Sequence, residues 1–227
     1  MTLSILIPTL ESRRLLFERI FMQLTDQIRI NGLEREVEVL WLRDDKVMTV
    51  GAKRNELLRR ACGDFVAFVD DDDSVAPDYV ARICQTLHAN PQVDCIGIKG
   101  IIRFRNSHPT EFIHSLQYRE YSSRDGRYLR PPYHLNPIRR AIACRYDFAP
   151  ISYSEDIDWA LRLCRDGVLR NEVFLEGPLY FYASRRYWPY QWMLDRTEWI
   201  RHALGLTMVS RVRIWDFLAM RGSAQGR

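Results

Sequence analysis

The sequence predicts an α/β fold: a Rossmann-like α/β/α sandwich with a mostly parallel sheet, followed by a helical C-terminal extension. Apolar runs of strand length alternate with amphipathic helical segments through the first hundred residues, a pattern typical of a parallel sheet with helices on both faces. Acidic residues directly follow two of these runs, at the edge where such sheets bind ligands. With 47% hydrophobic and 27% charged residues, the 227-residue chain can bury a core, which excludes disorder.

The elements of the first half follow one another as strand, helix, strand, helix, strand, helix, strand. Strands are expected at Leu3–Pro8, Val37–Leu42, Phe65–Val69 and Val93–Ile98, and helices at Glu11–Ile30, Gly51–Cys62 and Asp78–His88. The first helix is predicted to bury one apolar face, made of Leu15, Leu16, Ile20, Leu24 and Ile28.

The second half is less regular. Residues 99–133 hold many arginines and tyrosines, and we expect a long loop or a β excursion there. A helix is predicted over Ser154–Gly167, with Ser154 as its N-cap, acidic residues in its first turn and Gly167 at its end. Two or more amphipathic helices bearing Trp and Arg are expected from Gln191 onward.

Charge is divided unevenly along the chain. Residues 1–98 carry a net charge of −4 and residues 99–227 a net charge of +8. The simplest interpretation of a basic half is a solvated surface. The division also indicates an acidic first half that needs a cation and a second half that tolerates an anionic partner.

The cysteines and the lengths of the apolar runs indicate in which cellular compartment the protein is expected. The five cysteines, at positions 62, 84, 95, 144 and 164, are odd in number and scattered, which favours reduced, mostly buried thiols in a cytoplasmic protein over a disulfide framework. The longest apolar runs are too short to cross a bilayer, and the N-terminus lacks the basic region of a signal peptide.

Four consecutive aspartates follow the apolar run Phe65–Val69. Asp70–Asp73 would repel one another unless a cation belongs there. Hard divalent ions such as Mg²⁺ or Mn²⁺ take oxygen ligands, typically one or two carboxylates together with phosphates and water. The alternative is an acidic turn that caps the next helix, although four acids exceed what capping requires. A DxD-type metal site is therefore predicted at this point.

A second acidic site is the triplet Ser154-Glu155-Asp156. A serine followed by acidic residues is what many helix starts prefer, so capping alone would explain it. Beside a metal and phosphate site, one carboxylate here could instead act as a general base on an attacking hydroxyl.

The order of SILIPT, VEVLWLRDD, GAKRNELLRRACGDFVAFVDDDD and SEDIDWALRL resembles the GT-A glycosyltransferases, in particular the family 2 type, over about residues 2–170. The resemblance implies a GT-A fold and an inverting, metal-dependent transfer of a sugar from a nucleotide-diphospho-sugar, taken as a UDP-sugar, with Mn²⁺ or Mg²⁺. It divides the chain into a donor-binding half at residues 1–105, an acceptor and catalytic half at residues 106–184, and a basic, Trp-rich helical extension at residues 185–227.

Site roles carry over from the same resemblance, position by position. Asp156 would be the general base, with Glu155 beside it, and Asp72 the principal metal ligand. The other metal ligands would be Asp70 and Asp73. The donor would contact Pro8, Thr9, Glu11, Asp44, Asp45, Lys53, Arg54, Asn55, Asp70 and Asp71. On the acceptor side, the candidates are His134, Asn136 and Trp159.

Two departures from the family pattern affect these expectations. Leu10-Glu11 stands where the family often has an aromatic residue and an asparagine, which bears on the base-stacking contact. The late segment that begins at Leu179 offers no clear counterpart of a metal-binding histidine, so the metal would be held mostly by Asp72 and the diphosphate.

The acceptor stays open between two classes. One is a glycan, free or lipid-linked at a membrane face, and the other is a hydroxymethylated base in DNA, as in some phage enzymes that resemble the family; a phage protein would work in the host cytoplasm. The aromatic and basic stretch Tyr118–Arg130 would suit a phosphate backbone. A non-catalytic module that binds a nucleotide-sugar or a divalent metal is the alternative to an enzyme. The residues that could lie at a membrane interface are Trp188, Trp192, Trp199, Trp215, Arg185, Arg186, Arg196, Arg201, Arg211 and Arg213.

Overall fold

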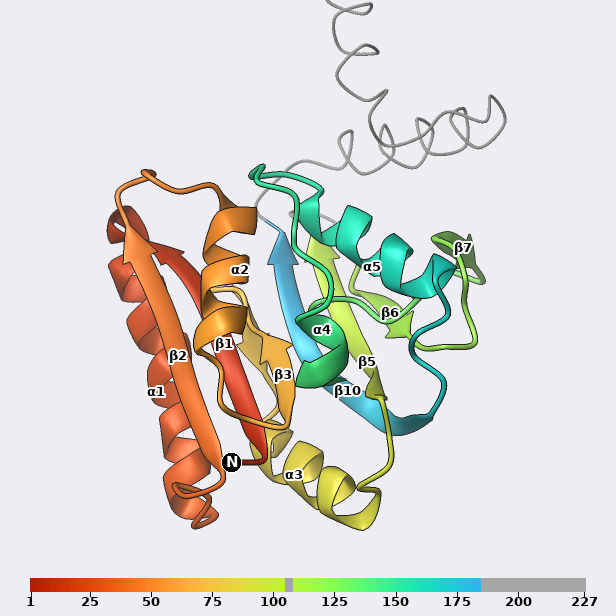
Figure 1. The fold of residues 1–227 in the computed structure, drawn as a ribbon, viewed down its shortest axis with the longest axis horizontal. Coiled ribbons are helices and arrows are strands. Elements are labelled where there is room, and N and C mark those ends of the chain that lie inside the picture. The colour runs from red at the N-terminus through yellow and green to blue at the C-terminus, as the bar shows by residue number, and fades with distance from the viewer. Residues whose placement is uncertain (105–107, 185–227) are drawn as a thin grey trace, which may run out of the picture. The chain divides into compact units, whose positions relative to one another are not determined.

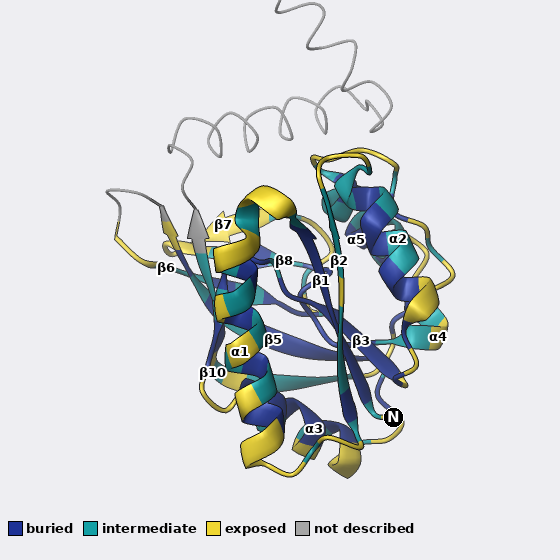
Figure 2. Ribbon diagram, turned by 90° about the vertical axis from the view of Figure 1, so that its left-hand side faces the viewer, coloured by how far each residue is buried: buried dark blue, intermediate teal, exposed yellow. Residues whose placement is uncertain are grey.

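The structure is a computed structural model that describes residues 1–104 and 108–184. These residues form a three-layer sandwich in which helices cover both faces of one sheet (Figure 1). α1 and α3 lie on one face, and α2, α4 and α5 lie on the other, as the turned view of Figure 2 shows. The helices are α1 (Arg14–Ile30), α2 (Val50–Arg60), α3 (Tyr79–Ala89), α4 (Arg140–Ala143) and α5 (Glu155–Arg165), and a 3₁₀ turn, Glu11–Arg13, precedes α1.

The sheet is mixed, and parallel pairs occur in both halves of the chain. Its strand order is β2-β1-β3-β9-β5-β6-β8-β7, and β10 pairs with β5 and β4. β1 is parallel to β2 and β3, and β5 is parallel to β10, whereas β9 is antiparallel to both its neighbours. The strands are β1 (Leu3–Leu10), β2 (Val37–Asp44), β3 (Phe65–Phe68), β4 (Ser74–Val75), β5 (Cys95–Phe104), β6 (Thr110–His114), β7 (Ser122–Arg124), β8 (Arg127–Arg130), β9 (Ile138–Arg139) and β10 (Glu172–Ser184).

Strand β1 is buried on both sides, which explains its continuous apolar sequence. Ile5 and Ile7 belong to the core beneath α1 and α3, while Leu6 belongs to the core beneath α2 and α5. The second core also contains Phe68 and Trp159, each about 1% exposed. Because β1, β2 and β3 are parallel, their carboxyl ends meet at one edge, and the residues that follow them are brought together there.

The predicted α/β class and mostly parallel sheet are confirmed, with corrections to individual elements. β9 separates β3 from β5, so the fourth predicted strand does not pair directly with the third. The first helix buries Phe17 in place of Leu15, which is 81% exposed, because the 17, 20, 24, 28 spacing follows the helical repeat more closely. Ser154 precedes α5 but makes no side-chain capping bond, since its backbone is left-handed with φ of 64°.

Three further predictions concern residues 99–133, the cysteines and the C-terminal helices. Residues 99–133 do form a β excursion, made of β5 to β8. All five cysteines are free thiols, but Cys62 and Cys144 are exposed, so the mostly buried expectation is wrong for these two. The helices predicted from Gln191, and the Trp and Arg residues assigned to a membrane interface, lie outside the described residues. Within the part that is described, no helix is long and apolar enough to cross a membrane.

Candidate active site

The carboxyl ends of β1 and β2 are tied together by a buried lysine of α2. Lys53 donates to the carbonyl oxygen of Thr9 at 2.6 Å, and its ammonium group also contacts the carboxylate of Asp44. Burial works to raise the pKa of Asp44, but the hydrogen bonds from Lys53 and from the backbone of Met48, together with the charge of Lys53, outweigh burial and lower that pKa. Lys53 therefore fixes the corner that the sequence assigns to the nucleotide.

An open groove lies beside this corner, and of the predicted donor contacts only Asp44 lines it. The groove has a volume of about 590 Å³, which is within the range of small-molecule sites. Asp44 lines it and accepts a hydrogen bond from the backbone of Met48 at 2.6 Å, while Asp45 is exposed. On the β1 side, Pro8 is buried and the carboxylate of Glu11 is exposed, 3.9 Å from Arg43.

The four aspartates after β3 alternate in exposure. Asp70 and Asp72 expose 26% and 22% of their side chains, whereas Asp71 and Asp73 are buried. Asp71 accepts a hydrogen bond from Thr9 at 2.7 Å, and Asp73 accepts one from the Tyr180 hydroxyl at 2.8 Å. Burial raises the pKa of Asp71 to about 6, against the effects of Thr9 and Arg13. Asp73 would reach a ligand only after leaving Tyr180.

Two arginines before and within α1 hold this acidic loop. One nitrogen of Arg13 lies 2.7 Å from Asp71, and the other contacts the carboxylate of Asp72. Arg19 donates to the backbone carbonyls of Asp72 and Asp73 at 3.1 and 2.8 Å. The charge of the aspartate run is thus partly balanced by the chain itself.

A third arginine, Arg54 on α2, joins the two acidic sites. Its guanidinium lies 3.0 Å from Asp70 and 3.3 Å from Glu155, and it stacks over the Phe68 ring at 4.9 Å. Burial works to lower the pKa of Arg54, but Asp70 and then Glu155 outweigh it and hold the pKa above its usual value. Against burial, Arg54 likewise holds the pKa of Asp70 far below its usual range.

The acidic pair at the start of α5 is divided between a buried and a partly exposed carboxylate. Glu155 is 3% exposed, and burial together with the charge of Asp156 raises its pKa to about 7. Asp156 exposes 19% of its side chain. Of the two carboxylates, that of Asp156 is therefore the more accessible.

His134 lies between the two acidic sites. Its Nε2 is 3.7 Å from Asp70 and its Nδ1 is 3.7 Å from Asp156, distances too long for hydrogen bonds. Both ring nitrogens are buried, and within the described chain neither has a hydrogen-bond partner. Burial, followed by the charge of Arg54, lowers the pKa of His134, so the ring is neutral at pH 7.

Three other predicted site residues use their polar groups on the backbone. Asn136 is buried and donates to the carbonyls of Ile96 and His114 at 2.9 and 3.3 Å. Trp159 is buried and donates to the carbonyl of Tyr146 at 2.8 Å. Asn55 bonds to the backbone of a neighbouring loop instead of facing the groove. Their predicted contacts with acceptor and donor stay predictions.

The site suits a metal ion that is coordinated partly by protein carboxylates and partly by a substrate, but not one that is coordinated by protein side chains alone. Among the described residues, no group of three or more His, Cys, Asp or Glu side chains could hold an ion by itself. Asp72 is partly exposed, and one of its carboxylate oxygens is contacted by Arg13. Since Mg²⁺ is usually bound through one or two carboxylates and substrate phosphates, Asp72, with Asp70 beside it, fits such an ion.

Comparison with known proteins decides the family. The sequence model of glycosyl transferase family 2 matches residues 32–147, about half of the chain. The chain belongs to this family. The matched region includes Lys53 and Asp70–Asp73 and ends before Glu155. No curated protein sequence matches the chain significantly.

Solved structures with the same fold include the S. aureus protein TarS. TarS residues 1–349 in complex with UDP-GlcNAc are 15% identical with a TM-score of 0.57, and the match covers 82% of this chain and 60% of that one. The complex with UDP is 16% identical with a TM-score of 0.56, covering 81% and 61%. At this identity the likeness shows the fold alone. The chain spans about 60% of the TarS chain it matches.

Two residues that hold the site together, Arg13 and Tyr180, were not predicted from the sequence. Arg13 stands just after the first strand, where its position beside a strand end was a usable signal. Tyr180 donates to Asp73, and its hydroxyl also accepts from the backbone N–H of Asp70 at 3.0 Å, although it lies far away in the chain. No local pattern marks that contact.

Proposed function

We propose that the protein is an inverting glycosyltransferase that moves a sugar from a UDP-sugar to an acceptor hydroxyl. The observation that carries this proposal is that Asp70 and Asp156, from opposite halves of the chain, flank one buried imidazole at 3.7 Å each. A donor-side carboxylate and a candidate base thus belong to one site. Family membership and the UDP and UDP-GlcNAc complexes of TarS support the choice of donor.

The reaction is a single displacement at the anomeric carbon. The acceptor oxygen forms a bond to that carbon, the bond from the carbon to the diphosphate oxygen breaks, and the hydroxyl proton passes to Asp156. One displacement inverts the configuration and needs one carboxylate opposite the leaving group. Asp156 suits this role because its carboxylate is partly exposed, while that of Glu155 beside it is buried.

The donor's diphosphate needs positive charge as it leaves. A Mg²⁺ or Mn²⁺ ion held by Asp72 and Asp70 would supply that charge as a Lewis acid. Arg13, 38% exposed and bound to Asp71 and Asp72, is the resident cation at the same place. Lys53 is buried against Asp44, so its contribution is to hold the groove in shape.

For the acceptor, we propose a hydroxyl of either a glycan or a hydroxymethylated base in DNA. Support for an anionic acceptor comes from the +8 charge of residues 99–227. In the stretch Tyr118–Arg130, Arg130 stacks over the rings of Tyr121 and Tyr128 at 4.8 and 5.6 Å, so part of this basic, aromatic surface is already ordered.

The testing experiment is a donor screen. UDP-, GDP- and TDP-sugars are incubated with Mn²⁺ and with either glycans or hydroxymethylated DNA, and released nucleotide is measured. We expect release from a UDP-sugar, its loss with EDTA and its return with Mn²⁺ or Mg²⁺. Calorimetry with UDP accompanies the screen. A chain that binds no nucleotide would contradict the proposal, and one that binds UDP-sugar without turnover on any acceptor would favour a binding module.

The two acceptor classes can be distinguished by how binding to DNA depends on salt concentration. Retention on duplex DNA that falls steeply with salt indicates phosphate contacts, and a flat response removes the DNA option. Partition to anionic vesicles, measured in parallel, supports a membrane-face glycan.

A further inference from the structure

The side chain of Asn55 on α2 forms two hydrogen bonds with the backbone of one distant residue, Phe148. Its Nδ2 donates to the carbonyl oxygen of Phe148 at 2.9 Å, and its Oδ1 accepts from the N–H of Phe148 at 2.7 Å. A carboxamide that satisfies both backbone groups of one residue fixes that residue in position and direction. Phe148 belongs to residues 144–154, which connect α4 to α5 and which we call the acceptor segment.

The same face of α2 contacts the acceptor segment at further points. The N–H of Gly51 donates to the carbonyl of Ile151 at 3.0 Å. A Cβ atom added at Gly51 would lie 1.9 Å from the carbonyl oxygen of Ala149. Since no side chain fits there, glycine at this position lets α2 lie directly on the segment's backbone.

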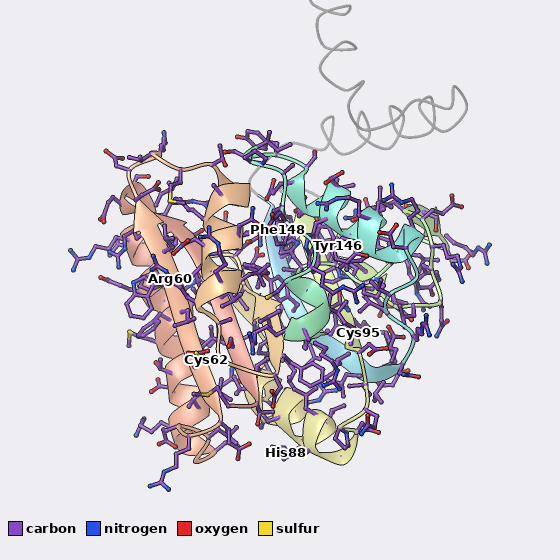
Figure 3. All side chains as sticks on the ribbon, in the orientation of Figure 1. Arg60, Cys62, His88, Cys95, Tyr146 and Phe148 are labelled. Carbon is purple, nitrogen blue, oxygen red and sulfur yellow. The ribbon has the colours of Figure 1, made fainter. Side chains whose placement is uncertain are left out.

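Beyond Phe148, the contacts continue to the helix that carries the candidate base. The Phe148 ring stacks on Trp159 with centroids 4.7 Å apart and planes 10° from parallel. Trp159 also donates to the carbonyl of Tyr146 at 2.8 Å. It lies on α5 one turn after Asp156. In Figure 3, Phe148 and Tyr146 lie between α2 and α5.

We propose that Asn55 is a positioning residue for Asp156, acting through Phe148 and the acceptor segment. The donor corner and the segment share α2, because Lys53 points to Thr9 and Asp44 while Asn55 points to Phe148. Asn55 thus sets where Asp156 stands relative to a donor bound beside Asp70. This inference rests on the proposed function for the role of Asp156. It gives Asn55 a role on the acceptor side instead of the donor contact that was predicted from the sequence.

The expected consequence is a separation of binding from turnover. Loosening the segment would shift the base without touching the donor groove, and a misplacement of about 1 Å costs on the order of 100-fold in rate. A residue that lined the donor pocket would instead weaken nucleotide binding.

The experiment uses the full chain with Asn55→Asp. This change keeps the shape of the side chain and the oxygen that accepts the hydrogen bond from the N–H of Phe148, but it places a second carboxylate oxygen against the Phe148 carbonyl oxygen. A second variant, Gly51→Ala, pushes the segment away by the contact with Ala149. The matched control is Gln27→Glu, since the buried Gln27 amide makes an equivalent pair of hydrogen bonds, to the carbonyl of Ala76 and the N–H of Val80, between α1 and α3. UDP affinity, kcat for transfer and amide hydrogen exchange are measured for each.

We expect both α2 variants to bind UDP like the wild type, to lose on the order of 100-fold in kcat, and to exchange faster at residues 146–151. The control should lose stability but keep kcat per folded molecule. Weakened UDP binding with unchanged kcat would overturn the proposal and return Asn55 to the donor pocket. If the wild type itself neither binds nor transfers, the proposed function fails, and hydrogen exchange alone tests whether Asn55 holds the acceptor segment. Faster exchange confined to residues 146–151 supports that role of Asn55, and unchanged exchange overturns it.

Discussion

The donor side and the acceptor side of the site differ in how complete they are. On the donor side, the charged groups are already paired: Lys53 with Asp44, and Arg54 with Asp70. On the acceptor side, His134 is buried with both nitrogens unbonded among the described residues, and Asp156 stands partly exposed. The charges of the proposed donor side are thus paired in advance, while hydrogen bonds on the proposed acceptor side are left for a substrate or a small rearrangement to supply.

The physical reason lies in the cost of burial. An unpaired buried charge is expensive, so Arg54 and Asp70 persist only as partners. A neutral imidazole without partners costs about 1–3 kcal/mol, an amount that a folded domain can tolerate at a functional position. The first four predictions test this contrast, from the largest expected effect to the smallest.

Arg54→Leu should have the largest effect on stability. The change leaves Asp70 and Glu155 without their shared buried cation, and breaking such a pair costs about 3–5 kcal/mol. Chemical denaturation measures the free energy of unfolding. The double variant with Asp70→Asn should recover part of the loss, because the carboxylate that Arg54 keeps ionised is then gone. A loss below about 1 kcal/mol would show that the donor side is not pre-paired as described.

Glu155→Gln should reduce the pH dependence of stability. In the folded protein the pKa of Glu155 is raised from 4.5 to about 7. Between these two pH values the folded state therefore keeps a proton on Glu155 that the unfolded state has released. The free energy of unfolding of the wild type therefore falls as pH rises from about 4.5 to 7, by up to about 3 kcal/mol. Unfolding curves across this window measure it. The fall should be smaller in the variant but not absent, because the pKa of Asp71 is also raised, to about 6, in both proteins. An equal fall in both proteins would assign it to groups other than Glu155.

His134→Phe should separate stability from activity. Phenylalanine keeps the ring packing against Phe68 and Tyr133 and removes two unbonded nitrogens, so we expect stability to be unchanged or higher by about 1 kcal/mol. UDP binding should persist while transfer falls by about tenfold or more. Melting temperature, calorimetry and transfer rate are compared. A strong loss of stability would mean that His134 is already bonded and that the two sides do not differ.

Arg13→Gln should have the smallest effect on folding. Arg13 is 38% exposed, and ion pairs at such positions contribute about 0–1 kcal/mol. Its removal frees the carboxylate of Asp72, so Mn²⁺ should bind more tightly in the presence of UDP, as measured by the free-ion signal in electron paramagnetic resonance. Arg14→Gln, which removes the exposed pair with Glu18, is the control. Equal Mn²⁺ affinity in both variants would contradict competition between Arg13 and the metal.

The sequence predicted the fold well because the parallel strands carry continuous apolar runs and the helices carry a regular apolar face. The order β1, α1, β2, α2, β3 follows from local patterns alone. Leu15 and Phe17 show the limit: both are apolar, but the helical repeat places Phe17 on the buried face of α1, while Leu15 is 81% exposed. β9 is two residues long and could not be foreseen between β3 and β5.

The candidate site was predicted by position but not by pairing. Asp70–Asp73 and Glu155–Asp156 stand out locally, and parallel topology gathers the first group at a ligand edge. That Arg54 would join Asp70 to Glu155, which lies 101 residues after Arg54, depends on tertiary packing. The same holds for Asn55, whose partner Phe148 is 93 residues away. Side chains that bridge halves of a site leave no periodic signal in the sequence.

The most direct test of the account is Asp156→Asn compared with Asp158→Asn. Both lie in the first turn of α5, but Asp158 pairs with Arg162 of the same helix and takes no part in the site. UDP-sugar binding is measured by calorimetry and transfer by released nucleotide. We predict that Asp156→Asn binds the donor like the wild type and loses transfer by at least about 100-fold, while Asp158→Asn keeps both. Full transfer by Asp156→Asn would contradict the assignment of the base and, with it, the account of the acceptor side.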